Sequence, residues 1–273
     1  MLQIFSKSCI GYSHIKNKKV CQDYTSHYHD NDRTIITCAD GHGGDLYVRS
    51  HIGAQVASCA IINVFSSITL SDLRRITVKE FCDKIRLEVL CEWNRQIESH
   101  IAKYPIRKSE IEHLEDEKKE LLKKFPVKAY GTTLAGAMVL NNKLIVISIG
   151  DTEVLGIQKG ELIKFFDYDD DPAANITNSM CQEDAYNYLR VKIYDFKLYD
   201  GVLLCSDGLS SPYQSYVNFK ESFVKPLMKR IINGESLSYV SDYVVDMALR
   251  LGIGDDVSLS FIINDKAFKK YYN

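Results

Sequence analysis

Apolar and polar positions change period along this chain, from strand-like runs to helical spacing and back. Short apolar or alternating runs at residues 2–5, 24–28 and 33–38 predict strands. After the last of these runs, residues 45–66 place apolar side chains on one helical face, and Asp45 is the expected N-cap. The opening third of the chain therefore predicts three strands followed by a helix.

Two capping-box patterns predict two further helices. Thr77-Val-Lys-Glu80 pairs a hydroxyl with a carboxylate three residues later, and apolar residues recur every four positions behind it, as far as Ile101. Ser109-Glu-Ile-Glu112 repeats the pattern ahead of a highly charged segment, which Pro126 ends. We expect the charges of that segment to form a solvated helix face.

The second half of the chain predicts strands joined by tight turns, then helices. Asn141-Asn142 and Lys159-Gly160 are turn sequences between apolar runs, and links of two residues require antiparallel neighbours. Residues 167–187 have no period, so they predict a long surface loop near the site. The other expected elements are strands at 132–140, 143–149, 153–158, 161–166, 191–196, 202–205 and 257–263, and helices at 217–232, interrupted at Pro226, and at 237–251.

Length, charge and cysteine usage narrow the function classes. The chain has 273 residues, and we expect residues 1–273 to form one domain. A net charge of -2 gives no basic excess of the kind that nucleic acid or a membrane surface would attract. The eight cysteines include no C-x-x-C pair, and no apolar stretch has the length of a signal-peptide core or a membrane span. These features predict a cytoplasmic protein with reduced thiols.

Acidic residues stand at the ends of four predicted strands. Asp40 and Asp207 each follow a strand and precede glycine, whereas Asp23 and the pair Asp255-Asp256 each precede a strand. A single aspartate in such a place is more often a turn residue than a ligand. Carboxylates that converge at one sheet edge, however, need cations to offset their repulsion. Oxygen ligands favour Mg²⁺ or Mn²⁺ over zinc.

Such a cluster predicts a metal-activated water. Two ions about 3.5 to 4 Å apart can share a hydroxide and direct it in line at a phosphorus atom. His42 lies two residues beyond Asp40 between glycines, where packing does not account for it, so we expect it to protonate the departing alkoxide. The basic segment 16–19 with His14 could hold a phosphate, although a solvated loop explains it equally well.

Six short motifs occur in this order along the chain: Cys21-Gln22-Asp23, Asp40-Gly-His-Gly-Gly44, Gly131-Thr-Thr133, Gly150-Asp-Thr152, Ser206-Asp-Gly208 and Asp255-Asp-Val-Ser258. Their order resembles the metal-dependent protein phosphatase 2C family, in particular its bacterial-type members with Gln-Asp. The resemblance implies a four-layer α-β-β-α fold of the α+β class, with a central antiparallel β-sandwich flanked by helices.

The resemblance also assigns roles to individual residues. It implies that Asp40 bridges the ions and that the carbonyl of Gly41 binds one of them. Asp207 and Asp255 would bind the other ion, and Asp23 would hold metal-bound water. His42 would be the general acid, Asp256 takes a place where the family often has Asn, and Asp151 would belong to the framework.

This chain departs from the family pattern at two places. Gln22 stands where many relatives have Glu, which removes one charge near the metals. The family's phosphate-binding arginine has no Arg counterpart here, so His14, Lys16 or Lys18 must substitute for it.

The expected function is hydrolysis of phosphoserine and phosphothreonine in proteins, with two or more Mn²⁺ or Mg²⁺ ions and a role in signalling. The expected partners are a phosphoprotein and a cognate Ser/Thr kinase, with no nucleic acid and no membrane. No Cys is followed by Arg six positions later, and the P-loop pattern is missing from the sequence, which disfavours thiol-based and nucleotide-driven chemistry. A pseudophosphatase that acts as a binding module and a small-metabolite phosphohydrolase remain as alternatives.

Overall fold

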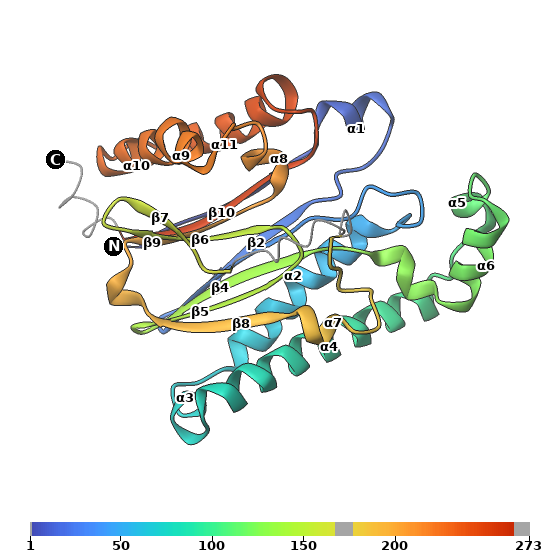
Figure 1. Cartoon of the computed structure of the whole chain (residues 1–273), viewed down its shortest axis with the longest axis horizontal. Helices are drawn as coiled ribbons and strands as arrows, with labels where there is room; N and C mark the ends of the chain where they lie inside the picture. Colours follow the sequence, from blue (N-terminus) through green and yellow to red (C-terminus); the bar gives the residue numbers. More distant parts are fainter. Residues whose placement is uncertain (1, 167–176, 265–273) are drawn as a thin grey trace.

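Two five-stranded antiparallel sheets form the centre of the molecule (Figure 1). The computed structural model describes residues 2–166 and 177–264. The first sheet has the order β1 (Leu2–Cys9), β10 (Val257–Asn264), β9 (Gly201–Cys205), β6 (Glu153–Gln158) and β7 (Glu161–Lys164). The second has the order β2 (Tyr24–His29), β3 (Arg33–Ala39), β4 (Leu134–Leu140), β5 (Lys143–Ile149) and β8 (Arg190–Asp195).

Helices cover the outer face of each sheet, which gives four layers (Figure 1). The long helices α2 (Ser50–Ser67) and α4 (Val78–Lys103) pack on the second sheet. The first sheet is covered by α9 (Tyr216–Phe219), η3 (Lys220–Val224), α10 (Lys225–Ile232), α11 (Ser238–Asp246) and η4 (Met247–Leu251). The expected α-β-β-α architecture is therefore confirmed.

Alternation along the strands explains the layering. In β3, Ile36 and Cys38 face the core between the sheets, whereas Ile35 and Ala39 face α2 and α4. Successive strand residues point to opposite faces, and here both faces are covered, so Thr34 through Ala39 are all buried. The strand therefore reads as a continuous apolar run in the sequence.

The predicted turns and the first capping box are confirmed. Lys159 and Gly160 have φ of 50° and 77°, and Asn141 has φ of 54°, so both hairpins use the left-handed region. Thr77 and Glu80 form the expected reciprocal hydrogen bonds at the start of α4. The remaining described helical segments are α1 (Tyr12–Lys16), α3 (Asp72–Arg75), α5 (Lys108–Ile111), α6 (Asp116–Lys124), η1 (Pro126–Tyr130), α7 (Ala185–Tyr188), η2 (Phe196–Leu198) and α8 (Asp207–Ser210).

The first predicted helix starts later than expected. Asp45 is not its N-cap, because the chain makes two turns, from Gly44 to Tyr47 and from Tyr47 to Ser50, before α2 begins at Ser50. Arg49 then turns inward, where its guanidinium binds Glu110. A contact with a residue this distant in sequence overrides the local capping preference.

The second capping box is wrong for the same reason. Glu110 accepts hydrogen bonds from the backbone N–H of Arg107 and from Arg49, and Ser109 does not cap a long helix. The predicted helix is therefore divided into α5 and α6. Of the predicted loop at 167–187, residues 167–176 lie outside the described residues, and α7 is a helical turn in the remainder.

The expected break at Pro226 does not occur. The π-helical turn η3 ends at Val224, and Pro226 is in the first turn of α10, which begins at Lys225. A proline ring lacks an N–H and crowds the carbonyl four residues earlier in a regular helix. The wider π turn relieves this conflict, so the chain stays helical from Tyr216 to Ile232.

Among the described residues, no helix combines the length and apolarity needed to cross a bilayer.

Candidate active site

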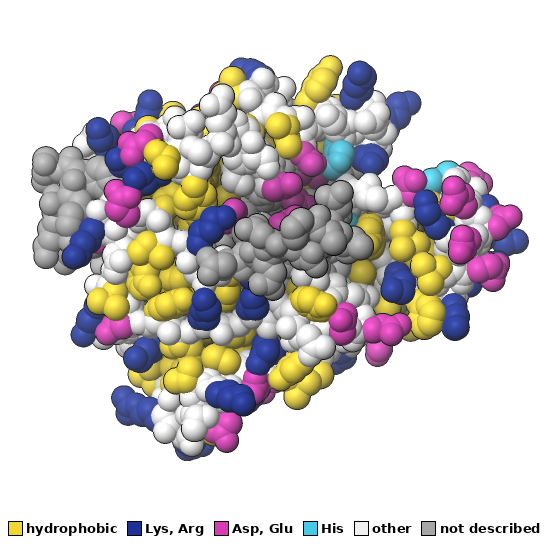
Figure 2. Space-filling view, viewed as in Figure 1, with side chains coloured by type: hydrophobic (Ala, Val, Ile, Leu, Met, Phe, Trp, Pro, Cys, Tyr) yellow, Lys and Arg dark blue, Asp and Glu magenta, His cyan; other side chains and the backbone are white. Residues whose placement is uncertain are grey.

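The acidic segments of the sequence meet at one end of the sandwich. Asp40 follows β3, Asp207 follows β9, and Asp255 precedes β10 by two residues. Asp23 directly precedes β2, which pairs with β3 so that Tyr24 lies opposite Ala39. Figure 2 shows acidic side chains gathered on this face beside a histidine, next to α1.

Asp40 and Asp207 lie within one electrostatically coupled group. Burial raises the pKa of Asp40 well above its usual range, and the negative charges of Asp23, Asp207, Asp151 and Asp255 raise it further. Burial also raises the pKa of Asp207, followed by the charges of Asp151 and Asp255, while a hydrogen bond with Asp40 opposes the rise. The carboxylates therefore destabilise one another's ionised forms, which bound cations would reverse.

Asp23 is the most enclosed of these ligand candidates, with 6% of its surface exposed. Burial raises the pKa of Asp23 to about 7, the charge of Asp256 adds to the rise, and the hydroxyls of Ser206 and Ser258 oppose it. Its Oδ2 is buried and accepts no hydrogen bond from any residue that the structure describes. A buried oxygen of this kind fits a metal ion or its bound water.

The backbone around Gly41 is closely packed. Its N–H donates to the carbonyl of Gln22 at 3.2 Å. A Cβ atom on Gly41 would lie 2.7 Å from that oxygen and 2.9 Å from the carbonyl carbon of Ser50. Glycine is thus required where the chain passes between Gln22 and Ser50. This donor set, carboxylates beside a glycine carbonyl, fits Mg²⁺ or Mn²⁺.

Three ligand-type side chains form one compact group at this end of the sandwich. Among residues 2–166 and 177–264, the atoms of His14, Asp255 and Asp256 lie within 4.8 Å of one another, whereas Asp40 and Asp207 belong to no such group. Asp40 and Asp207 are linked instead by a hydrogen bond between their side chains.

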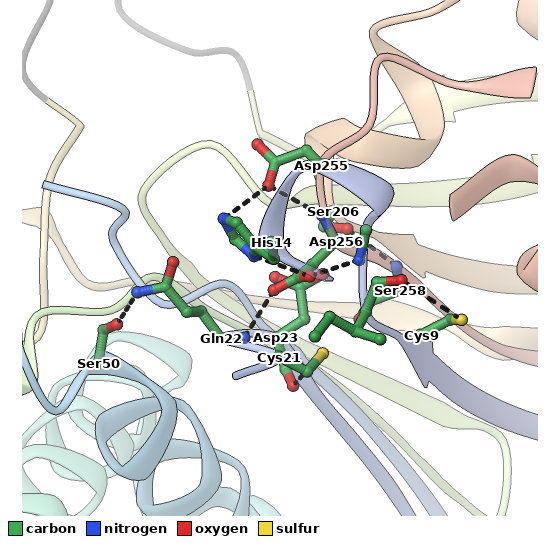
Figure 3. A network of polar contacts seen from close by, with 12 residues as sticks. Cys9, His14, Cys21, Gln22, Asp23, Ser50, Ser206, Asp255, Asp256 and Ser258 are labelled. Atoms are coloured by element: carbon green, nitrogen blue, oxygen red, sulfur yellow. Dashed lines mark hydrogen bonds and ion pairs between the residues drawn. The ribbon is translucent and has the colours of Figure 1, made fainter. Parts of the chain in front are cut away.

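Asp256 anchors the N-terminal segment (Figure 3). It is 2% exposed, and its Oδ1 and Oδ2 accept the backbone N–H groups of Gly11 at 2.7 Å and Gln22 at 2.6 Å. Nδ1 of His14 lies 2.9 Å from Oδ1 of Asp256, without the alignment of a hydrogen bond. Asp255 differs, since its side chain is half exposed and accepts the N–H of Asp256 at 2.8 Å.

The three candidates for the phosphate subsite occupy different environments. His14 lies in α1 and is the one that reaches the carboxylates, with Nε2 3.7 Å from Asp255 (Figure 3). Lys16 and Lys18 are exposed, and their side chains form no hydrogen bond or ion pair with other described residues. The structure therefore brings His14, and not the lysines, into direct contact with the acidic cluster.

His42 is packed, contrary to the expectation from the sequence. Its ring lies 4.9 Å from that of Tyr47, and its backbone N–H donates to the carbonyl of Gly131 at 3.1 Å. Burial lowers the pKa of His42, and the charge of Asp151 opposes this. Its Nε2 is buried without a hydrogen-bond partner among the described residues, so packing does not engage this nitrogen.

Sequence reasoning missed the contribution of Gln22 and Ser50. Nε2 of Gln22 donates to Oγ of Ser50 at 2.5 Å (Figure 3). It also donates to the carbonyl of His42 at 3.1 Å. The amide thus braces the segment that carries His42 against the start of α2. No local pattern marks Ser50, because its partner lies 28 residues away.

Asp151 was expected to be framework, yet its charge acts on Asp40, Asp207 and His42. Its Oδ2 accepts a hydrogen bond from Thr177 at 2.8 Å. The motif Gly150-Asp-Thr152 was the one sequence feature that could have indicated this role. The structure brings the Asp151 carboxylate to the acidic cluster.

A four-layer sandwich with carboxylates converging at one end fits the class of metal-dependent hydrolases. The family model described as protein phosphatase 2C matches residues 10–240, so the chain belongs to the protein phosphatase 2C family. Members of this family are serine/threonine phosphatases that use Mn²⁺ or Mg²⁺, so the expected function class and cofactors are confirmed. No curated protein is similar enough in sequence to count as a match.

Solved structures confirm the fold. The serine/threonine phosphatase PstP/Ppp of Mycobacterium tuberculosis is 18% identical with a TM-score of 0.60, over 96% of this chain and 98% of that chain. The phosphatase Stp1 of Staphylococcus aureus is 14% identical with a TM-score of 0.58, over 96% and 95%. The catalytic domain of PstP in complex with 2 manganese ions is 17% identical with a TM-score of 0.57, over 96% and 97%.

Proposed function

We propose that this chain removes phosphate from phosphoserine and phosphothreonine in a protein substrate, using residues 1–273 as one catalytic domain. The observation that carries the proposal is the convergence of Asp23, Asp40, Asp207 and Asp255 at one end of the sandwich. Buried carboxylates of like charge cost stability unless cations bind them. A pure binding module would have no use for such a cluster.

The metal-binding role in this proposal belongs to the acidic residues and to Gly41. Asp40, the carbonyl of Gly41, Asp207 and Asp255 would hold the ions. Asp23, whose Oδ2 has no hydrogen-bond partner among the described residues, would hold a water beside them. The ions, when bound, supply a hydroxide nucleophile and neutralise phosphoryl oxygens.

His42 acts on the leaving group in this proposal. Its Nε2 has no hydrogen-bond partner among the described residues, and it would pass a proton to the serine or threonine oxygen as the P–O bond breaks. The brace from Gln22 to the carbonyl of His42 and the packing of Tyr47 would hold the ring in place.

We assign the phosphate subsite to His14, with Lys16 and Lys18 as exposed positive charges at the rim. His14 is the candidate in contact with Asp255, and the two lysines are exposed on the same segment. Cationic groups there would attract the anionic substrate to an acidic cluster that otherwise repels it. A cytoplasmic location and a cognate Ser/Thr kinase that supplies the phosphoprotein complete the proposal.

The test is release of phosphate from a phosphothreonine peptide with and without Mn²⁺, for the wild type, Asp207→Asn and Asp116→Asn. Asp116 is 97% exposed on α6, which makes it a matched control. We expect Mn²⁺-dependent turnover that Asp207→Asn abolishes and Asp116→Asn retains. Background release by a folded wild type would favour the pseudophosphatase, and far faster cleavage of small phosphate esters would favour a metabolite phosphohydrolase.

A further inference from the structure

A groove of about 360 Å³ opens beside the acidic cluster. One wall is formed by Lys19 and Val20, which lead into Gln22 and the candidate ligand Asp23. A second wall begins at Gly43, the residue after His42. The groove therefore shares its inner end with the segments that carry the proposed catalytic groups.

Its floor and outer end come from elements further along the chain. Tyr47 and Val48, just before α2, line the floor, and Glu110 and His113 line the outer end. Glu110 belongs to α5, which together with α6 projects beyond the sandwich at the same end as α1 (Figure 1). The groove thus runs from the site toward this projection.

We propose that this groove binds an apolar side chain of the substrate, within about three residues of the phosphorylated serine or threonine. The inference rests on the proposed function and adds to it the chemistry of the flanking sequence. An extended peptide advances about 3.3 Å per residue, so a phosphorylated residue at the carboxylates would place a near neighbour in the groove.

The lining favours an apolar side chain over a charged one. Val20 is 54% exposed although it is a large apolar residue, and Tyr47 and Val48 are only partly covered. Lys19 and Asp45 both line the groove and carry opposite charges, so together they give it little net electrostatic field. Covering Val20 with an apolar side chain removes both surfaces from water.

The outer wall is fixed before any peptide binds. Arg49 joins Glu110 through two hydrogen bonds, of 2.7 and 2.9 Å, and also binds the carbonyls of Tyr104 and Pro105. Its side chain is 5% exposed, which makes the pair a rigid support for α5. The Glu110 charge is therefore already compensated and is not available to select a basic residue. A preformed wall lowers the ordering cost of binding.

The experiment compares phosphothreonine peptides that carry Leu or Ser at each of the three positions on either side. Wild type, Val20→Asp and Val217→Asp are assayed on the peptides and on p-nitrophenyl phosphate. Val217 is 62% exposed on α9, in the opposite outer layer, and serves as the matched control. Peptide binding is measured in parallel by fluorescence anisotropy, so that the groove is tested independently of turnover.

We expect Leu at one of these positions to raise kcat/KM and tighten binding about tenfold, the scale of a few methylenes in an apolar pocket. Val20→Asp should remove this preference, whereas Val217→Asp should keep it. Equal binding of the Leu and Ser peptides at all six positions would overturn the proposal that the groove binds an apolar side chain. An equal preference for Leu in Val20→Asp and Val217→Asp would also overturn it. Failure of the proposed function looks different, because none of the phosphopeptides would then be turned over above background, whether or not the ester is cleaved.

Discussion

The carboxylate of Asp256 accepts the backbone N–H of Gln22 at 2.6 Å, although 234 residues separate the two in the chain. Its second oxygen accepts the N–H of Gly11 at 2.7 Å. One buried side chain therefore fixes both ends of the segment that brings His14 and Gln22 to the site. Asp256 is a positioning residue, which distinguishes it from its neighbour Asp255.

Replacing Asp256 with Ala should destabilise the metal-free protein by about 2 to 5 kcal/mol, because two backbone N–H groups would lose a charged acceptor in a buried place. Urea unfolding measures the change. Asp246→Ala is the control, since that residue makes a partly exposed ion pair with Arg250 and should cost less than about 1 kcal/mol. Equal losses in the two variants would contradict the anchoring role.

Exchanging Gln22 for Glu should also lower stability, in spite of the nearly identical shape. The amide group donates to the carbonyl of His42 and to Ser50, and a carboxylate oxygen in its place cannot donate to that carbonyl. The expected cost is about 1 to 3 kcal/mol in urea unfolding. Gln55→Glu, on an exposed position of α2, should stay near the wild-type value. A Gln22→Glu protein as stable as the wild type would show that the two hydrogen bonds donated by Gln22 do not contribute to stability.

His42→Gln should separate substrates by their leaving groups. With a phosphothreonine peptide, whose alkoxide needs a proton, turnover should fall by about 10² to 10⁴. With p-nitrophenyl phosphate, whose phenolate leaves without one, the loss should be much smaller. Steady-state kinetics in Mn²⁺ on both substrates provide the comparison. An equal loss on the two would mean that His42 does not act as the acid.

The Arg49–Glu110 pair should give the protein a measurable acid sensitivity. The hydrogen bond from Arg49 lowers the pKa of Glu110 from 4.5 to about 2. A depressed folded-state pKa contributes stability above the unfolded pKa and loses it as the pH falls through the folded pKa. The stability gap between wild type and Glu110→Gln should therefore be about 1 to 3 kcal/mol at pH 6 and shrink between pH 4.5 and 2.

Urea unfolding across that pH range measures the gap, with Glu112→Gln, at an exposed position, as the control. A Glu110→Gln gap that stays constant with pH would exclude ionisation as its source. The control should show no comparable change over the same interval.

Local signals predicted the parts of the fold that depend on neighbours in sequence. The φ values of Lys159 and Gly160 follow from their turn chemistry, and the box of Thr77 and Glu80 closes within one helical turn. The Asp-Gly ends of two strands likewise marked the acidic cluster. In the turn and in the capping box, the interacting groups lie within four residues of one another.

Local sequence patterns did not predict contacts between residues that are far apart in the chain. Asp45 failed as a cap because Arg49 reaches Glu110, 61 residues away. The bracing role of Gln22 requires Ser50, and Asp256 shows its function only when Gly11 lies against it. A helix break was expected at Pro226 because no local sequence pattern indicates the π turn that accommodates the proline ring.

The pairing of β1 with β10 has a consequence for biosynthesis. Every residue of β1 lies opposite a residue of β10, from Leu2 against Asn264 to Cys9 against Val257. On the ribosome, β1 cannot pair with its neighbour until residues 257–264 have been translated, and the hydrogen bond from Gly11 to Asp256 cannot form earlier either. Closure of so long a loop is slow, so the nascent enzyme should remain inert until β10 emerges and docks.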